Sequence, residues 1–128
     1  VRPTDANDLL RHQTIDFFDA DACRATDYVL VKGREKITVV ADGDLAVDNA
    51  RAGLTCALAG LGIYEDFDFL LHPHLLEGKL VRVLPDWKRP GPTVLALYPS
   101  GRQNSVPVRA FLRFLDSVLS PALKEVVA

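Results

Sequence analysis

The feature that most constrains this chain is a cluster of three prolines, Pro85, Pro90 and Pro92, in the segment Pro-Asp-Trp-Lys-Arg-Pro-Gly-Pro. Each proline fixes φ and removes a backbone hydrogen-bond donor, so neither a helix interior nor a central strand can cross this segment. We therefore expect a stiff linker here, with one structural part before it and another after it.

Before the linker, β-type runs alternate with helical patterns. Residues 14–18, 28–32 and 36–41 are rich in β-branched and aromatic side chains, and Gly33 predicts a short hairpin loop between the last two runs. Strands are also expected from residue 63 and over residues 79–84. This alternation predicts an α/β fold with a sheet of mixed direction, in which the hairpin supplies antiparallel edges.

The first helical patterns have clear end signals. Asp5 is a candidate N-cap for a short helix, and Asp8 places a second carboxylate in its first turn. Residues 49–61 form a slim helical pattern, for which Asp48 is a candidate cap and Gly62 the expected left-handed stop.

Two further helical stretches flank the linker. Residues 67–72 and 73–77 predict a helical pair that ends at Gly78. After the linker come an expected strand over residues 93–98 and a helix beginning after Ser105. That helix should carry an apolar stripe and should end or kink at Pro121. The stripe contains Val108, Phe111, Leu112, Leu115, Val118 and Leu119.

Composition excludes several classes of function. A chain of 128 residues with 48% hydrophobic residues suits one soluble domain, and no apolar run approaches the roughly 20 residues of a membrane span. The formal charge of −2 offers no cationic surface for nucleic acid. Cys23 and Cys56 are far apart and fit a reducing cytoplasm, although a peroxide-sensing pair is the alternative interpretation.

Candidate catalytic and metal sites are weak. His72 and His74 could suggest a metal site with nearby aspartates, but Pro73 between them breaks the helical face that would align them, so we expect surface residues and no metal. The serines lie outside any nucleophile-elbow motif, and the Gly-Leu-Gly at residue 60 closes a helix instead of opening one. We therefore expect no enzyme, no cofactor, and a packed structural role for Trp87.

Several motifs keep a fixed order along the chain. They are Pro3 with Asp8-Leu9 and His12, then Asp42-Gly43-Asp44-Leu45, Gly60-Leu61-Gly62-Ile63, Gly78-Lys79-Leu80-Val81-Arg82-Val83-Leu84-Pro85-Asp86-Trp87, Leu97-Tyr98-Pro99-Ser100 and Val108-Arg109-Ala110-Phe111. In combination they resemble the C-terminal effector-binding domain of the LysR-type transcriptional regulators. The sequence departs from that pattern at Glu65 and Asp66, where many members have apolar residues. Either the strand ends early at the surface or the rim of the binding cleft is more acidic.

The resemblance implies an incomplete two-lobed domain like the type II periplasmic binding proteins. Residues 1–88 would be the second lobe (RD-II), and residues 89–128 the hinge return, last strand and C-terminal helix of the first lobe (RD-I). The last strand and helix would then lack their sheet, so we expect them to pack on the second lobe or on another copy of the chain.

The same resemblance implies the function and its site. A small-molecule inducer would bind in the cleft between the lobes, and DNA would be bound only through a missing N-terminal winged helix-turn-helix. The protein would be a cytoplasmic homo-oligomer, a dimer or tetramer. On this chain the candidate effector-binding residues are Phe18, Asp19, Ala20, Asp21, Asp48 and Asn49. A solute-binding protein of a transporter, which shares the fold, is the alternative.

Overall fold

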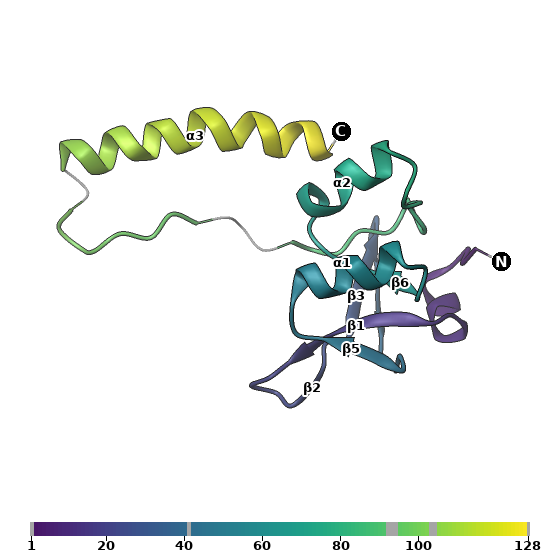
Figure 1. Cartoon of the computed structure of the whole chain (residues 1–128). Coiled ribbons are helices and arrows are strands. Elements are labelled where there is room, and N and C mark those ends of the chain that lie inside the picture. Colours follow the sequence, from purple (N-terminus) through teal and green to yellow (C-terminus); the bar gives the residue numbers. More distant parts are fainter. Residues whose placement is uncertain (1, 41, 92–94, 103–104, 128) are drawn as a thin grey trace. The chain divides into compact units, whose positions relative to one another are not determined.

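The computed structural model describes residues 2–40, 42–91, 95–102 and 105–127. The chain divides into two compact units, Val1–Pro90 (unit 1) and Gly91–Ala128 (unit 2). Figure 1 labels the elements and colours the chain along its sequence. The division falls inside the expected linker. Each unit is described by itself.

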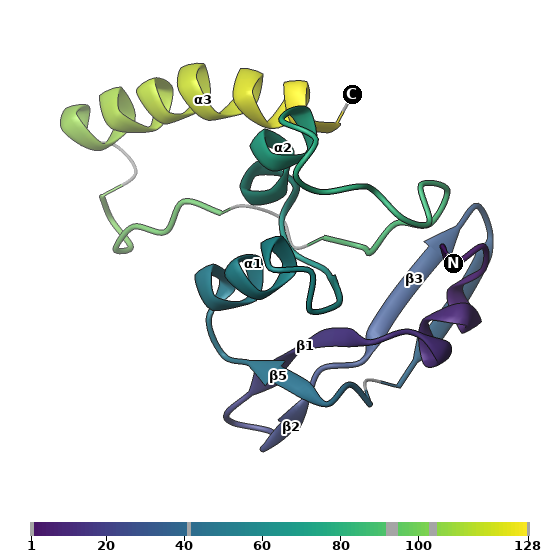
Figure 2. The ribbon, with the colours of Figure 1, turned by 45° about the vertical axis from the view of Figure 1, so that its right-hand side comes forward.

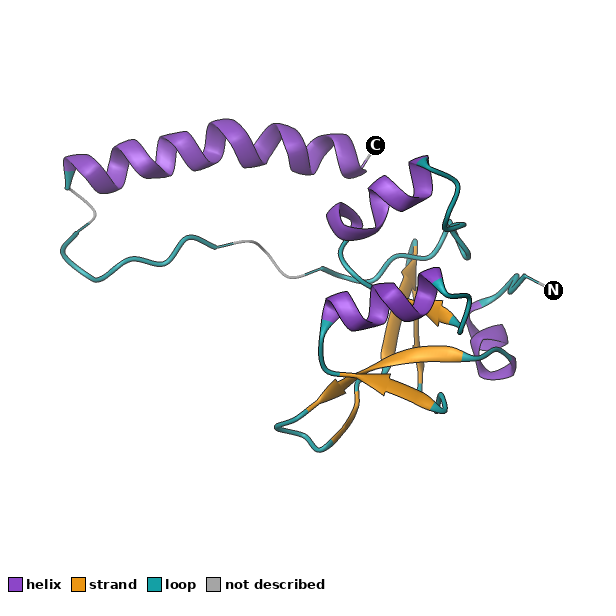
Figure 3. Cartoon of the chain, in the orientation of Figure 1, coloured by secondary structure: helices purple, strands orange, loops and turns teal. Residues whose placement is uncertain are grey.

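The central sheet of unit 1 has mixed direction, as the sequence predicts. β1 (Thr14–Asp19) lies between β5 (Leu45–Val47) and β6 (Ile63–Tyr64) and is parallel to both. The short β2 (Arg24–Ala25) pairs antiparallel with the end of β1, inside a segment for which the sequence shows no periodicity. Strands occur only in this unit among the residues that the structure describes (Figure 3).

The predicted hairpin forms, but it is a second, separate sheet. β3 (Tyr28–Lys32) and β4 (Glu35–Val39) pair antiparallel, and Gly33 adopts the left-handed φ of 60° in the turn. The expectation that the hairpin supplies edges of the central sheet is therefore wrong. Its β4 strand instead contacts the 3-10 helix η1 (Ala6–Arg11). Figure 2 shows the hairpin beside this N-terminal helix.

The end signals of η1 are confirmed. The Asp5 side chain accepts a hydrogen bond from the Asn7 amide at 3.0 Å, and Asp8 reaches back to the Asp5 amide at 3.1 Å in a capping box. Hydrogen bonds from the Thr4 amide and hydroxyl, and then from the Asp5 amide, hold the pKa of Asp8 below its ordinary value. The short helix is a 3-10 helix of six residues.

The slim helix is α1 (Ala50–Leu58), and its end signals differ from the prediction. Asn49, not Asp48, is the N-cap. Gly60, with φ of 76°, provides the left-handed stop that we expected of Gly62. Gly62 is needed for another reason, because a Cβ there would lie 2.8 Å from the Gln13 carbonyl oxygen. α1 packs on the central sheet, as its small residues predict.

The region after β6 differs most from the sequence interpretation. One helix, α2 (Asp68–Leu76), replaces the expected pair and runs through Pro73, and Gly78 follows with φ of 69°. Residues 79–84 are not a strand, because no other strand pairs with them among the described residues. Leu84 itself has φ of 50°, outside the extended region that a strand requires.

The core of unit 1 lies between η1, the hairpin and residues 84–87, which include the start of the expected linker. Its buried members are Ala6, Leu9, Tyr28, Leu30, Val39, Leu84 and Trp87. Trp87 is only 8% exposed, which confirms its packed structural role.

Unit 2 contains α3 (Val106–Val127) and a preceding extended segment. Helix α3 begins after Ser105 as predicted and continues through Pro121, so of the two effects expected of this proline, an end or a kink, the end is wrong. The expected strand over residues 93–98 lies partly outside the described residues, and the described part, residues 95–98, is not a strand. No described helix combines the length and apolar character needed to cross a membrane.

Candidate functional site

The parallel sheet brings the predicted site residues to one edge. Phe17 pairs with Val47 across β1 and β5, so Phe18 on one strand and Asp48 after the other follow at the same carboxyl end. Loops and helix starts at the carboxyl ends of parallel strands are the usual location of ligand sites in open α/β sheets. We call the set Phe18, Asp19, Ala20, Asp21, Asp48 and Asn49 the sheet-end site.

Two of these side chains already have structural roles. The Asp19 carboxylate accepts hydrogen bonds from the amides of Asp21 and Ala22 at 2.9 and 3.1 Å, which closes the turn after β1. The Asn49 side chain accepts from Arg51 and Ala52 at 2.9 and 3.3 Å and so caps α1. Both are therefore positioned by the backbone that they stabilise.

The remaining members present their surfaces to solvent. Phe18 is 37% exposed, and Ala20, Asp21 and Asp48 are exposed as well. Among the described residues, neither Asp21 nor Asp48 has a carboxylate hydrogen bond or ion pair. The edge therefore offers the aromatic ring of Phe18 and the negatively charged carboxylates of Asp21 and Asp48. Such a surface suits a hydrogen-bond donor group of a ligand better than an anion.

A buried hydrogen-bond network lies at the middle of β1, and the sequence interpretation missed it. Asp16 is 1% exposed and accepts hydrogen bonds from the Tyr28 hydroxyl at 2.7 Å and from the Gly43 amide at 2.8 Å. Burial, together with the bond to Asp16, raises the pKa of Tyr28 far above its ordinary value. The signal in the sequence is an aspartate between the apolar residues Ile15 and Phe17 of β1, since a buried carboxylate must find donors.

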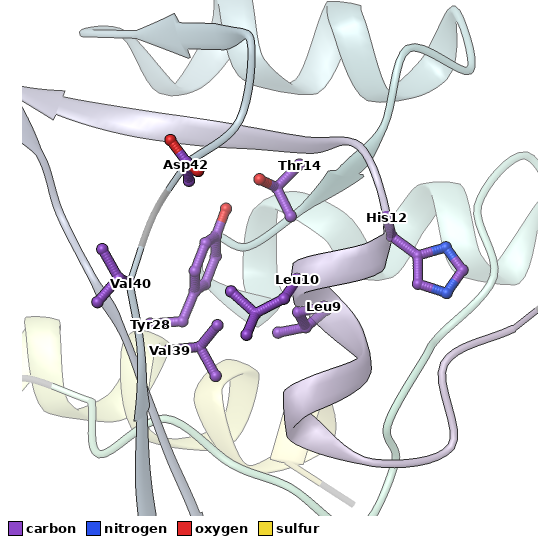
Figure 4. Close-up of a pocket in the computed structure, with 8 residues that line it drawn as sticks. All are labelled: Leu9, Leu10, His12, Thr14, Tyr28, Val39, Val40 and Asp42. Atoms are coloured by element: carbon purple, nitrogen blue, oxygen red, sulfur yellow. The ribbon is translucent and has the colours of Figure 1, made fainter.

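A small cavity lies at the other end of β1. Leu9, Leu10, His12, Thr14, Tyr28, Val39, Val40 and Asp42 line it, and its volume is about 60 Å³. Figure 4 shows the oxygens of Thr14, Tyr28 and Asp42 gathered at one side, while the His12 ring points away. Ligand pockets usually measure roughly 300–1,000 Å³, so this cavity suits ordered water and not an inducer.

The acidic residues that depart from the family pattern follow β6. Strand β6 ends at Tyr64. The first of the two alternatives drawn from the sequence, an early end of this strand, is therefore confirmed. Asp66 accepts a hydrogen bond from the Tyr64 hydroxyl at 2.5 Å and from the Phe67 amide at 2.7 Å, while Glu65 forms an ion pair with Arg89. Burial and the Asp66 bond raise the pKa of Tyr64 well above its ordinary value. Both carboxylates are half-buried and partnered, which offsets the cost of leaving water.

Other reactive side chains do not gather into a site. Cys23 is exposed and Cys56 half-buried, and both are free thiols. His72 and His74 are partly exposed on α2, a helix in which no described residue is fully buried. In the ranges that the structure describes, no group of His, Cys, Asp and Glu could hold a metal ion.

Comparison with known proteins gives a consistent result. A family model described as the LysR substrate binding domain matches residues 1–120. The HTH-type transcriptional regulator PtxR of Pseudomonas aeruginosa is 40% identical over 82 residues, which cover 64% of this chain and 26% of that protein. The HTH-type transcriptional activator TtdR of Escherichia coli K12 is 29% identical over 114 residues, which cover 89% of this chain and 36% of that protein.

Solved structures agree with the sequence comparisons. The regulatory domain of AphB from Vibrio vulnificus superimposes with a TM-score of 0.59 and 26% sequence identity, over 67% of this chain and 41% of that one. The chain thus spans only 26% to 36% of the length of these two curated relatives.

Proposed function

This chain belongs to the LysR substrate-binding domain family, and from that premise we propose that it is the effector-sensing part of a DNA-binding transcriptional regulator. Residues 1–88 would form the second lobe, and residues 89–128 the hinge return with the last strand and helix of the first lobe. A winged helix-turn-helix elsewhere in the protein would bind DNA. The assembly would be a homo-oligomer in the cytoplasm, without catalytic chemistry of its own.

The observation that carries the proposal is the convergence of Phe18 and Asp48 at one end of the β1–β5 pair. A small molecule at this sheet-end site would meet an aromatic ring, a free carboxylate and the first turn of α1. Its greater affinity for one arrangement of the lobes would shift their equilibrium, and attached DNA-binding domains would respond. The names of the relatives favour a regulator over a transporter's solute-binding protein.

The charges of the site favour a class of effector. Asp21 and Asp48 lack partners among the described residues, and no lysine occurs between residues 18 and 31. Arg24 forms an ion pair with Asp27 at 3.3 Å. We therefore propose an effector that presents an amine or hydroxyl donor to this lobe, with any carboxylate of the molecule bound by the other lobe.

The test uses the complete gene product, since a two-lobed cleft needs both lobes. A thermal-shift screen with amines, amino acids, polyols and small carboxylates identifies ligands, because binding raises stability by mass action. Calorimetry then compares Phe18→Ala and Asp48→Asn with the unmodified protein. We expect each substitution to weaken binding about 10-fold, the equivalent of about 1.4 kcal/mol.

Asp44→Asn is the matched control, because Asp44 is also exposed but lies at the opposite, amino end of β5. It should leave the affinity unchanged. Equal affinities in all three variants would contradict the sheet-end site. A protein that neither responds to any ligand class nor binds DNA would contradict the proposed function as a whole.

A further inference from the structure

The last residues of unit 1 form a strap that is docked along β3. We use the name strap for residues 84–89. Leu84 and Trp87, each 8% exposed, insert their side chains into the core. Val31 and Lys88 exchange two backbone hydrogen bonds, of 2.8 and 2.9 Å, and the Trp87 amide closes a turn onto the Leu84 carbonyl at 2.9 Å. The strap is thus a short extra partner for the β3 edge.

Local preference does not favour this conformation. Leu84 has φ of 50°, in the left-handed region that a residue with a Cβ rarely adopts. Such a conformation persists only where surrounding contacts hold it. The strap therefore depends on tertiary contacts and is sensitive to the loss of one of them.

Two ion pairs hold the strap, and they differ in how exposed their side chains are to solvent. Lys32 and Asp86 lie 3.4 Å apart, with side chains that are 49% and 72% exposed. Arg89 pairs with Glu65, and these side chains are only 39% and 25% exposed. Because water screens it less, the Glu65–Arg89 pair should hold the strap more firmly than the Lys32–Asp86 pair.

The position of the Glu65–Arg89 pair gives it a specific role. Glu65 directly follows β6, which is paired with β1, so Arg89 ties the last residue of the strap to the central sheet. Pro90 comes next and has no amide to donate, and the division between the units follows it. No ladder bond beyond Lys88 holds the chain at this point among the described residues.

We propose that the Glu65–Arg89 ion pair is a latch that keeps the strap on β3 and so sets the length of free chain between the two units. When the latch opens, the end of the strap leaves β3, and residues that were part of unit 1 join the tether. The latch is built from this chain's own residues, Glu65 after β6 and Arg89 at the end of the strap. It does not depend on which molecule the sheet-end site binds.

Amide hydrogen exchange of the 128-residue chain, resolved by NMR, tests the latch. Glu65→Gln keeps the shape of the side chain and removes its charge. We expect the Val31 and Lys88 amides to exchange about 2- to 5-fold faster, the range of a partly exposed ion pair, while the amides of β1 keep their rates. Arg89→Gln should give the same increase, and the double variant should add little to either, because one interaction is lost in all three.

Lys79→Gln is the control, because Lys79 belongs to a different ion pair. It pairs with Glu77 at 2.7 Å, and neither residue is part of the strap. It should not alter exchange at Val31 or Lys88. Unchanged rates in Glu65→Gln would overturn the latch. Equal acceleration of the β1 amides would overturn it too, because the ion pair would then stabilise unit 1 as a whole.

Discussion

Gly53 and Tyr64 form a contact that neither residue would reveal alone. Gly53 is buried in α1, and a Cβ there would lie 2.3 Å from Cζ of the Tyr64 ring. The Tyr64 hydroxyl lies 3.2 Å from the Ala50 carbonyl oxygen and donates to Asp66. Because Gly53 has no side chain, the Tyr64 ring can pack against α1, and its hydroxyl links this helix to the end of β6.

We predict that Gly53→Ala destabilises unit 1. Alanine gains about 1 kcal/mol of helix propensity over glycine, but overpacking against the Tyr64 ring costs about 1–3 kcal/mol. Urea unfolding followed by circular dichroism should therefore show a net loss near 1 kcal/mol. In a Tyr64→Ala background the clash is absent, so the same substitution should stabilise. A stabilising Gly53→Ala in the unmodified chain would contradict the packing.

The glycines show what residue-scale reasoning can and cannot predict. The sequence indicates a glycine stop after α1, and the structure has one, but at Gly60 instead of Gly62. The need for glycine at residue 62 comes from the Gln13 carbonyl, which is remote in sequence. The Asp16 network escaped prediction for a similar reason, because its partners Tyr28 and Gly43 meet only in the fold.

At the scale of elements, the beginning of α1 separates a structural residue from a candidate binding residue. Asn49 caps the helix through two amide bonds, whereas the Asp48 side chain has no partner among the described residues. Neighbouring polar residues before a helix look equivalent in a sequence. The structure distinguishes them.

We predict that substitution of Asn49 lowers the stability of unit 1 and that substitution of Asp48 does not. Asn49→Ala should cost about 1 kcal/mol of unfolding free energy, the usual value of a lost cap, and Asn49→Ser should restore most of it. Asp48→Ala should change stability by less than about 0.5 kcal/mol, as expected at an exposed position. Urea midpoints for the three variants decide this. A larger loss in Asp48→Ala than in Asn49→Ala would reverse the assignment.

Elements with strong periodicity were predictable, and those that need a partner were not. β1, the β3–β4 hairpin, α1 and α3 appear where their patterns place them. Residues 79–84 and 95–98 have the composition of strands, but a strand requires a neighbour to complete its hydrogen bonds, and no described segment offers one. The convergence of Phe18 and Asp48 followed from parallel pairing, whereas their role in binding stays a prediction.

At the scale of the whole molecule, unit 2 cannot cover its own apolar surface. Its described part contains one helix, and many of its large hydrophobic side chains are exposed, whereas Val108, Leu112 and Leu115 are half-buried. Leu97 is 91% exposed, and Phe111 and Phe114 are each 59% exposed on α3. A monomeric soluble protein rarely presents so much contiguous apolar surface. Under the proposed assignment of α3 to the first lobe, its packing partner would lie in the rest of that lobe, and the chain spans only 26% to 36% of these relatives.

We predict that the 128-residue chain, without that partner, self-associates through α3. Phe111 and Phe114 are three positions apart and so lie on neighbouring parts of one helix face. Light scattering across a concentration series should therefore show a mass above that of one chain for the unmodified protein. Phe111→Gln with Phe114→Gln should shift it toward the monomer, while Arg113→Gln, between them in sequence, should not. A monomer at every concentration, with α3 unfolded by circular dichroism, would contradict this self-association.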